Sequence, residues 1–382
     1  MKVVVVGNPG SRRVELLQAA LAGLGMPPAA LVSYADLLQG RAELAQHMCA
    51  GDLLRIESPG KDDEVERLLL AAGARAAAEE GAFAHMDARQ LAALAHEKGE
   101  ILLPRQWYHG LLAALALLKR QIAACPPHRA MADPDDIAAM FDKPESHRRM
   151  LAAQVAVPRT LGTPRCYDEL SEAMARERCP RVFVKLAHGS SASGVVAYQV
   201  GGGQHMATTT VEMQRGGDGA IRLFNSRRIR SYRDQREIAA LIDALCRHRA
   251  HVEQWLPKAG MAGMAFDMRV LVVAGQARHT VARMSRSPMT NLHLLNSRGD
   301  AGAVAERMGG AAWAAAMAAC QRAAACFPRS LHAGVDLLIA PDFRRHAVLE
   351  INAFGDLLPG ITHQGHDTYT AELLAALGEE SR

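Results

Sequence analysis

The sequence predicts an α/β fold in its first third and an α+β arrangement, rich in antiparallel strands, in the remainder. Strand-like runs alternate with amphipathic helical runs up to about residue 125, and this alternation favours a parallel sheet covered by helices. From residue 182 the apolar residues recur mostly with a period of two, as in half-buried strands. Cys125-Pro126-Pro127 separates the two patterns, and we place the first domain boundary there.

The composition is that of an ordinary soluble globular protein. Of the 382 residues, 49% are hydrophobic and 22% are charged, and the formal net charge of +4 gives no reason to expect a nucleic-acid or membrane partner. Seven scattered cysteines without a C-x-x-C pair indicate reduced thiols. The N-terminus lacks a signal-peptide pattern, and the longest later apolar run, residues 111–118, is too short to span a bilayer. We therefore expect a soluble, cytoplasmic protein.

The first region contains two strand–loop–helix units. The run KVVVVG is followed by the turn GNPGSRR and a helical pattern, and DLLRIESPG is followed by a helix that starts near Asp62. The turn GNPGSRR could hold an anion at a helix N-terminus, but it lacks G-x-G-x-x-G and a Walker A lysine. A tight turn between strand and helix is the better interpretation, with Arg12 and Arg13 as weaker candidates for contacting an acidic substrate. Residues 107–124 indicate a buried helix.

The second region begins with two short helices, over residues 132–143 and 144–154, the second with Pro144 in its first turn. An alanine-rich helix is expected from Gly302 to Phe327. Strands are expected over residues 181–187, 194–200, 250–256, 266–275, 277–284, 333–340 and 345–353.

The stretch VFVKLAHGSSASGVVAY places a glycine- and serine-rich loop after a lysine that ends a strand. Small residues let backbone amides approach a phosphate, and the lysine adds positive charge; these residues are Lys185, Gly189, Ser190, Ser191, Ser193 and Gly194. The same composition suits a flexible linker. A linker, however, rarely separates two strands that continue one pattern, so we interpret the loop as a flap that covers phosphates within a β-hairpin.

The last two strands bring acidic residues together. A turn centred on Phe343 would pair Ala340 with His346, Leu338 with Val348 and Asp336 with Glu350, and would leave Asn352 on the face of Glu350. Opposed carboxylates repel unless a cation lies between them, and this all-oxygen set suits Mg²⁺. The alternative, a solvated polar face, is disfavoured by the apolar neighbours, although a slip of one residue would separate the acids.

The middle hairpin, FDMRVLVVAG followed by ARHTVARM, places Asp267 and Arg269 on one face. A three-residue turn at 274–276 would put Arg283 opposite Asp267, whereas a two-residue turn would put Ala282 there. An isolated Arg–Asp pair is usually structural, but beside a phosphate an arginine stabilises transferred charge. Asn291, in TNLHL, is a further polar candidate.

Seven of these segments, in this order, resemble the ATP-grasp superfamily: Asp142-Lys143, Lys185 with its loop, HVEQWLPKAG, FDMR, TNLHL, AGVD and LEIN. The likeness is to the branch that contains glutathione synthetase-like ligases and ribosomal-protein glutamate ligases, and it covers residues 131 to 370. It implies a two-lobed ATP-grasp fold behind a pre-ATP-grasp, Rossmann-like domain. The implied domains are residues 1–130, an N-terminal lobe with the phosphate flap over 131–256, and a C-terminal lobe with the Mg²⁺ site over 257–382.

The resemblance also implies a nucleotide site. Lys143 and Lys185 would contact the phosphates of ATP, and the loop from Gly189 to Gly194 would cover them. Asp267 would contact the ribose end. The adenine would meet the backbone of the hinge residues Glu253, Gln254, Trp255 and Leu256.

Catalytic and metal roles follow from the same resemblance. Arg269 and Arg283 would hold phosphate or an acyl phosphate, with Asn291 close by. The ligands of Mg²⁺ (or Mn²⁺) would be Asp336, Glu350 and Asn352. Two positions depart from the family: Gln254 precedes the hinge aromatic where an acidic residue is frequent, and Met289 stands where an arginine is frequent. We expect Arg283 or Arg286 to take the place of that arginine.

The implied activity is an ATP- and Mg²⁺-dependent carboxylate–amine (or thiol) ligase that works through an acyl phosphate and releases ADP. Its partners would be small-molecule or peptide carboxylate and amine substrates, and homodimers are common in the family. Two rivals remain: an ATP-dependent phosphotransferase of the same fold, and a nucleotide-binding scaffold without catalysis. No convincing Ser-His-Asp or Cys-His set competes with these interpretations.

Two other segments carry weaker signals. Six arginines between residues 222 and 236 form either a solvated basic face or a rim for an acidic substrate; RNA contact ranks third, because only Phe224 and Tyr232 interleave them. His363, His366 and Asp367 could hold a second metal, but their spacing favours a substrate-side loop.

Overall fold

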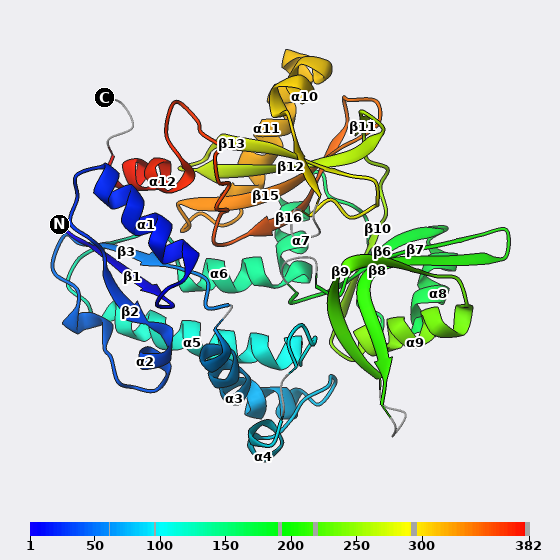
Figure 1. Ribbon diagram of the computed structural model, residues 1–382, viewed down its shortest axis with the longest axis horizontal. Coiled ribbons are helices and arrows are strands. Elements are labelled where there is room, and N and C mark those ends of the chain that lie inside the picture. The colour runs from blue at the N-terminus through cyan, green and yellow to red at the C-terminus, as the bar shows by residue number, and fades with distance from the viewer. Residues whose placement is uncertain (61, 95–96, 190–192, 217–220, 292–295, 379–382) are drawn as a thin grey trace.

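The computed structural model describes residues 1–60, 62–94, 97–189, 193–216, 221–291 and 296–378. Its strands form three sheets, each built from its own part of the chain (Figure 1). The predicted fold class is confirmed: a parallel sheet with helices comes first, and two mainly antiparallel sheets follow. The domain limits at residues 130 and 256 stay a prediction.

The first sheet is parallel, with the strand order β2-β1-β3-β4. Its central strand, VVVVG, is buried throughout, as expected for a parallel strand covered on both faces. Asp62 caps α3, as the sequence predicted, by accepting from two backbone N–H groups of the first turn. The elements are β1 (Val3–Gly7), α1 (Arg12–Gly23), β2 (Ala30–Ser33), α2 (Tyr34–Leu38), β3 (Leu53–Ile56), α3 (Asp63–Glu80), α4 (Ala88–Ala92), α5 (Pro104–Ala123) and β4 (Arg129–Ala130).

Helices α3 and α5 cross in very close contact because each presents a glycine. A Cβ atom on Gly73 would lie 2.0 Å from the carbonyl oxygen of Gln106, and one on Gly110 would lie 1.8 Å from that of Leu69. Neither position therefore has room for a side chain. This crossing fixes the start of α5, which reaches the cleft described below.

The second sheet has the strand order β5-β10-β6-β7-β8-β9 and forms what we call the N-lobe. The predicted hairpin around the glycine-serine loop is confirmed, because β6 and β7 pair in antiparallel fashion. Helices α8 and α9, which we did not predict, cover one face of this sheet (Figure 1). The elements are β5 (Thr160–Gly162), α8 (Tyr167–Arg176), β6 (Arg181–Leu186), β7 (Val196–Gly201), β8 (Gln204–Arg215), β9 (Ile221–Tyr232), α9 (Gln235–Cys246) and β10 (Ala250–Gln254).

The third sheet has the order β14-β13-β12-β15-β16, with β11 added to β12, and forms the C-lobe. The single helix predicted over 302–327 is wrong: Gly309, with φ 77° and ψ 155°, breaks it into α10 and α11. The elements are β11 (Gly260–Met261), β12 (Met264–Val273), β13 (Gln276–Ser285), β14 (Ser297–Gly299), α10 (Ala301–Met308), α11 (Gly310–Ala325), β15 (His332–Ile339) and β16 (His346–Asn352).

Three further helices connect these sheets. The two predicted short helices are confirmed as α6 (Pro134–Phe141) and α7 (Lys143–Ala152), which join the first domain to the lobes. The chain then ends with α12 (Thr368–Leu377), which returns to α1 of the first domain (Figure 1).

The pairing of Asp336 with Glu350 is confirmed, but the register beyond it differs from the prediction. Leu349 is inserted as a bulge, so that Leu337 rather than Leu338 lies opposite Val348, and Ile339 rather than Ala340 lies opposite His346. The bulge lies on the turn side of the acidic pair. The two carboxylates therefore keep their pairing although the outer half of the hairpin is shifted by one residue.

The middle hairpin reaches the predicted pairing by a different route. Its turn has two residues, Ala274 and Gly275, which both have positive φ (49° and 75°), as a type I′ turn requires. Such a turn was expected to place Ala282 opposite Asp267. A bulge at Arg278 restores the register, and Arg283 lies opposite Asp267.

The apolar cores do not coincide with the three sheets. One core joins β1, β3 and α5 of the first domain to β12, β15 and α11 of the C-lobe, whereas the N-lobe sheet has a core of its own. A third core packs α12 against α1 and β1. The first domain and the C-lobe therefore form one packing unit, and the N-lobe is a second unit attached to it.

No helix in the described ranges combines the length and hydropathy that a membrane span requires. All seven cysteines are free thiols, as predicted.

A buried ionic cluster ties α12 to the first domain. Arg55 Nε lies 2.5 Å from Glu57 Oε1, and Arg55 Nη1 lies 2.7 Å from Glu372 Oε2. His332, at the start of β15, is buried beside this cluster, and burial together with the charge of Arg55 lowers its pKa to about 3. The imidazole is therefore neutral in the folded protein at pH 7.

Gly110→Ala should destabilise the protein by about 1–3 kcal/mol, the usual cost of overpacking, because the new methyl group would overlap Leu69. The matched control is Gly23→Ala at the end of α1, where a Cβ would meet nothing within 4 Å. That control should be neutral or stabilising by up to about 1 kcal/mol. Urea unfolding of the two variants measures both changes, and a Gly110→Ala variant as stable as the parent would contradict the close crossing.

His332→Gln should weaken the loss of stability that acid causes. The folded pKa, about 3, lies below the unfolded value, so the unfolded chain binds more protons and stability falls as pH drops from about 6.5 towards 3. His188 and His248, with pKa values lowered to about 4 by burial, contribute in the same direction and remain in the variant. Urea midpoints between pH 7 and 4.5 should therefore fall less steeply for His332→Gln than for the parent. Identical slopes would show that His332 does not titrate as described.

Candidate active site

A cleft of about 970 Å³ is lined by residues from the first domain and from both lobes. Most of the predicted site residues line it: Lys143, Lys185, Gly189, Glu253, Gln254, Leu256, Asp267, Arg269, Arg283, Asn291, Asp336, Glu350 and Asn352. Trp255 and Gly194 belong to the same segments but are not part of the lining. Ser190 and Ser191 lie outside the described residues.

Lys185 projects into this cleft from β6 and forms an ion pair with the neighbouring strand. Its Nζ lies 2.5 Å from Oε2 of Glu253 on β10. Burial opposes its charge, but Glu253 and Glu350 raise the pKa of Lys185 above its usual value. Against the same effect of burial, Lys185 and His251 hold the pKa of Glu253 well below its usual range. Both residues are therefore charged at neutral pH.

Lys143 occupies the first position of α7 and connects the glycine-serine loop to the C-lobe. Its backbone N–H donates to the carbonyl of Ala187, and its Nζ donates to the carbonyl of Gly189 at 2.6 Å. The same Nζ lies 3.1 Å from Oε1 of Glu350 on β16. One lysine thus reaches the loop from the N-lobe and an acidic residue of the C-lobe.

The glycine-serine loop requires glycine at Gly194 and leaves little room for a side chain at Gly189. Gly194 has φ +65°, and a Cβ there would lie 2.3 Å from Cδ1 of Leu186. A Cβ on Gly189 would lie 3.0 Å from the carbonyl oxygen of Ser193. Both described ends of the loop therefore lie close to Leu186 at the end of β6.

The hinge between the lobes begins where β10 ends, at Gln254. Trp255 donates its backbone N–H to the carbonyl of Arg181, and its ring packs against that guanidinium, whose central carbon is 4.0 Å from the ring centroid. The ring of Phe183 also packs against the indole, with ring centroids 5.4 Å apart. The indole is thus held by β6, and Gln254 and Leu256 supply the cleft surface at the hinge.

Buried charges alternate in sign along the floor of the cleft. Asp267 lies 2.7 Å from Nε of Arg283 and 2.9 Å from Nζ of Lys258. Arg283 also reaches Asp336, at 3.1 Å, and Arg269 reaches the other oxygen of Asp336 at 3.0 Å. The arginines predicted to hold phosphate are therefore oriented by two carboxylates. The predicted ribose contact of Asp267 stays a prediction.

Three residues of this network were not predicted from the sequence. Lys258 and Thr290 both donate to Asp267, and Asp356 lies 3.1 Å from Nε of Arg269. Lys258 stands in HVEQWLPKAG and Thr290 in TNLHL, so the motifs contained them, but only the folded chain shows that they face Asp267. Asp356 follows β16 in a loop without a regular pattern, and no local signal marked it.

Asp336 and Glu350 face each other on neighbouring strands, with Asn352 two residues further along β16. Burial and the nearby carboxylates Asp267 and Glu350 raise the pKa of Asp336, although Arg269 and Arg283 counteract this. Asn352 donates its amide nitrogen to the carbonyl of Gly334 at 3.2 Å, which leaves its amide oxygen as a ligand atom. Two carboxylates and an amide oxygen are the donors that Mg²⁺ prefers, so this set fits the metal.

The arginine segment and the histidines near residue 363 make structural contacts. Arg222 forms ion pairs of 2.7 Å with Glu97 and Glu100, so at least this member of the arginine segment is internally neutralised. The backbone oxygen of His366 lies 2.9 Å from Nε2 of His279. Within the described ranges, no three His, Cys, Asp or Glu side chains are grouped so that they could hold a metal. A second metal site at His363 thus has no structural support.

Solved structures match this chain along its whole length, and they show that it has the ATP-grasp fold. The resemblance seen in the sequence is thus confirmed at the level of the fold. No protein-family model and no curated protein sequence matches the chain.

Three ATP-grasp proteins illustrate the likeness. D-cycloserine synthetase DcsG is 14% identical, with a TM-score of 0.56 and 99% of both chains covered. The ligase PsnB in complex with a minimal precursor is 14% identical, with a TM-score of 0.54 and coverage of 99% of this chain and 98% of that one. N5-carboxyaminoimidazole synthetase from Staphylococcus aureus, complexed with ADP, is 10% identical, with a TM-score of 0.54 and coverage of 100% and 78%. PsnB has also been solved with its minimal precursor, Mg and ADP, and that structure matches with a TM-score of 0.50.

Arg283→Met should destabilise the protein by about 3–5 kcal/mol, because it leaves Asp267 and Asp336 buried with one cation fewer. The control is Arg345→Met, which removes an exposed partner of Asp342 and should cost no more than about 1 kcal/mol. Urea unfolding measures both. Equal, small effects would show that Arg283 does not neutralise buried charge.

Proposed function

We propose that the protein is an ATP- and Mg²⁺-dependent ligase that joins a carboxylate to an amine and releases ADP and phosphate. The observation that carries the proposal is the convergence of four cationic side chains on one opposed acidic pair. Lys143 pairs with Glu350, whose charge also raises the pKa of Lys185, and Arg269 and Arg283 pair with Asp336.

This arrangement suits a triphosphate with its metal. Each acid is neutralised by side chains of the protein, Glu350 by Lys143 and Asp336 by the two arginines. When a nucleotide binds, the lysines can turn to its phosphates, and the two acids and Asn352 would hold Mg²⁺, which would supply positive charge against that of the phosphates.

The side chains have separate roles in the proposed reaction. Lys143 and Lys185 hold the phosphates of ATP, and the glycine-serine loop lies over them. Arg269 and Arg283 stabilise the negative charge that develops when the γ-phosphoryl group is transferred to the substrate carboxylate. The amine then attacks the acyl carbon of the resulting acyl phosphate, and phosphate leaves. Positioning and charge stabilisation account for this chemistry, so no nucleophilic side chain is needed.

The substrates should enter where the cleft meets the first domain. Arg12 and Arg13 line that part of the cleft, and Arg13 donates to the carbonyl of Phe354 just beyond β16. Trp107 and Phe141 also line it, with ring centroids 5.9 Å apart. A carboxylate that carries an apolar group fits these walls, as a small molecule or as part of a peptide. A precursor is bound by PsnB, which shares the fold. A homodimer stays a prediction.

Thermal unfolding with ATP-Mg²⁺, with ATP and EDTA, and with GTP-Mg²⁺ tests the nucleotide site. ATP-Mg²⁺ at 100 times its dissociation constant should stabilise the folded state by about 2.7 kcal/mol, and EDTA should reduce the shift. Lys185→Met should abolish it, because the charge at the phosphates is lost. Lys119→Met, at an exposed lysine paired with Asp135, is the control and should keep the full shift.

Product analysis then separates the ligase from its rivals. Incubation with ATP-Mg²⁺ and pools of carboxylic acids and amines should yield ADP and an amide, whereas a stable phosphate ester would indicate a phosphotransferase. A Glu350→Gln variant should fold normally and form no ADP. Saturating nucleotide that binds without any ADP formation would favour a non-catalytic scaffold, and an active, folded Glu350→Gln variant would overturn the metal assignment.

A further inference from the structure

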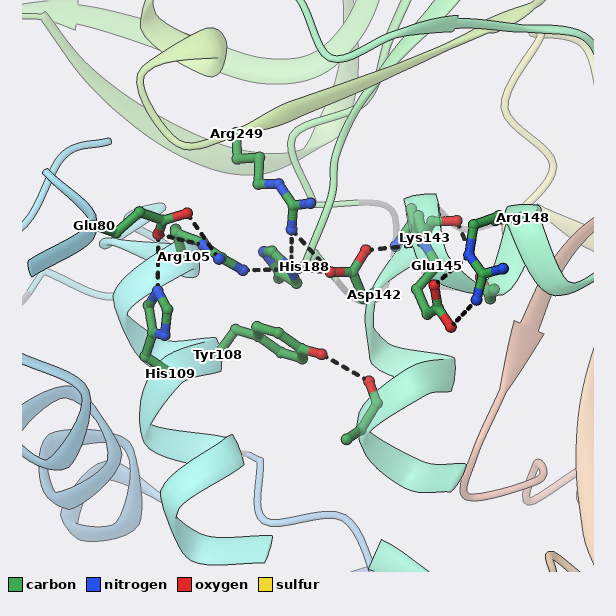
Figure 2. A network of polar contacts seen from close by, with 12 residues as sticks. Glu80, Arg105, Tyr108, His109, Asp142, Lys143, Glu145, Arg148, His188 and Arg249 are labelled. Atoms are coloured by element: carbon green, nitrogen blue, oxygen red, sulfur yellow. Dashed lines mark hydrogen bonds and ion pairs between the residues drawn. The ribbon is translucent and has the colours of Figure 1, made fainter. Parts of the chain in front are cut away.

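The N-lobe has its own apolar core, so its position over the cleft depends on a limited set of contacts with the rest of the molecule. One of these contacts is a buried polar network centred on His188, the residue that immediately precedes the glycine-serine loop (Figure 2). The network joins α5 of the first domain, the start of α7 and the N-lobe. Its members do not belong to the predicted phosphate, metal or hinge residues, apart from Lys143.

His188 is almost entirely buried at the edge of the cleft. Its side chain is fully buried, and its ring stacks on Tyr108 of α5 with a centroid distance of 4.0 Å and an interplanar angle of 15°. Its Nε2 lies 3.1 Å from Nη1 of Arg249 and 3.2 Å from Oδ2 of Asp142. Arg105, also on α5, approaches the same nitrogen to 3.4 Å. Four side chains from three parts of the fold thus determine where this ring lies (Figure 2).

Asp142 connects the ring to the lysine that enters the cleft. Its Oδ1 accepts from the backbone N–H of Glu145 and caps α7, which begins at Lys143. Its Oδ2 meets His188 and Arg249. Two neighbouring residues at the start of α7 thus contact two neighbouring residues of the N-lobe. Asp142 pairs with the side chain of His188, and Lys143 donates to the carbonyl of Gly189.

The charges of this network are fixed at neutral pH. Burial lowers the pKa of His188 to about 4, so the ring is neutral at pH 7. His188 and Arg249 hold the pKa of Asp142 well below its usual range, against the effect of burial. A neutral aromatic ring stacks on Tyr108 without the cost of burying a further charge beside Arg105 and Arg249. The protonation states of His188 and Asp142, and with them the contacts of the network, therefore do not change near neutral pH.

We propose that His188 is a positioning residue that fixes Lys143 and Gly189, at the start of the glycine-serine loop, against α5, so that the first domain sets the geometry of the nucleotide site. The proposal rests on the ligase function proposed above. Any displacement of α5 moves Tyr108 and Arg105, and through the ring of His188 it moves the carbonyl of Gly189 and the helix cap at Asp142. The contact thereby couples the domain that meets the substrates to the loop that meets ATP.

The dissociation constant for ATP-Mg²⁺, measured by titration calorimetry, tests the coupling. His188→Ala should raise it at least tenfold, because Gly189 and Lys143 lose their common support. His188→Phe, which keeps a ring for Tyr108, should recover part of the affinity. Tyr108→Leu should weaken binding in the same direction, whereas Tyr108→Phe removes only the hydroxyl that donates to Ala138 and should stay within twofold of the parent.

A second set of variants separates positioning from general stability. His205→Asn removes a different, partly buried histidine of the N-lobe, which contacts Tyr198 outside the cleft, and should leave the dissociation constant within twofold. In a double-mutant cycle, Tyr108→Leu and His188→Ala together should weaken binding much less than the product of the two separate effects.

The outcomes distinguish this inference from the proposed function. Normal ATP binding by the parent and by folded His188→Ala overturns the positioning role alone. Independent, multiplicative effects in the cycle do the same, because they show that the stack does not act as a unit. Absence of ATP binding by the parent itself overturns the proposed function, and this inference with it.

Discussion

The opposed carboxylates of Asp336 and Glu350 are the constraint around which the cleft is organised. Two acids on neighbouring strands, one of them buried, would repel each other strongly without cations nearby. Arg269, Arg283 and Lys143 supply these cations, each from a different strand or helix. Removing one charge from such a set leaves its partner buried without a counter-charge, which is unfavourable. The acids and the cations therefore depend on one another.

The same arrangement explains how a site for a polyanion can be stable within a folded protein. Four cationic side chains close to one another are unfavourable by themselves, and the acids of the cleft balance them. Lys185 is held by Glu253 in the same way that Lys143 is held by Glu350. In the proposed complex, phosphate and metal charges would replace these protein charges as partners of the lysines and acids.

The division of the apolar cores determines which parts of the fold are packed together and which part is attached by fewer contacts. The first domain and the C-lobe share a core, whereas the N-lobe, which carries Lys185 and the glycine-serine loop, packs separately. Contacts at the hinge, at the edge of β9 and at His188 therefore determine how this lobe lies over the cleft. At the edge of β9, for example, the N–H of Ile101 donates to the carbonyl of Leu223. Such polar contacts are easier to rearrange than a continuous apolar core, and this agrees with the proposed entry of a nucleotide beneath the lobe.

The sequence by itself determined the order of most elements, the facing of Asp336 and Glu350, and a set of candidate site residues most of which line the cleft. These follow from local rules, since alternation along a strand and the residues of a turn depend on near neighbours. It did not determine the bulges at Leu349 and Arg278, although the second of these decides that Arg283, and not Ala282, faces Asp267. The helices over 167–176 and 235–246 were not predicted either, although apolar residues at helical spacing are present there. Only the tertiary structure decided that Lys258, Asp356 and His188 belong to the site and its support, because their partners come from other elements and are brought close by packing between strands and domains.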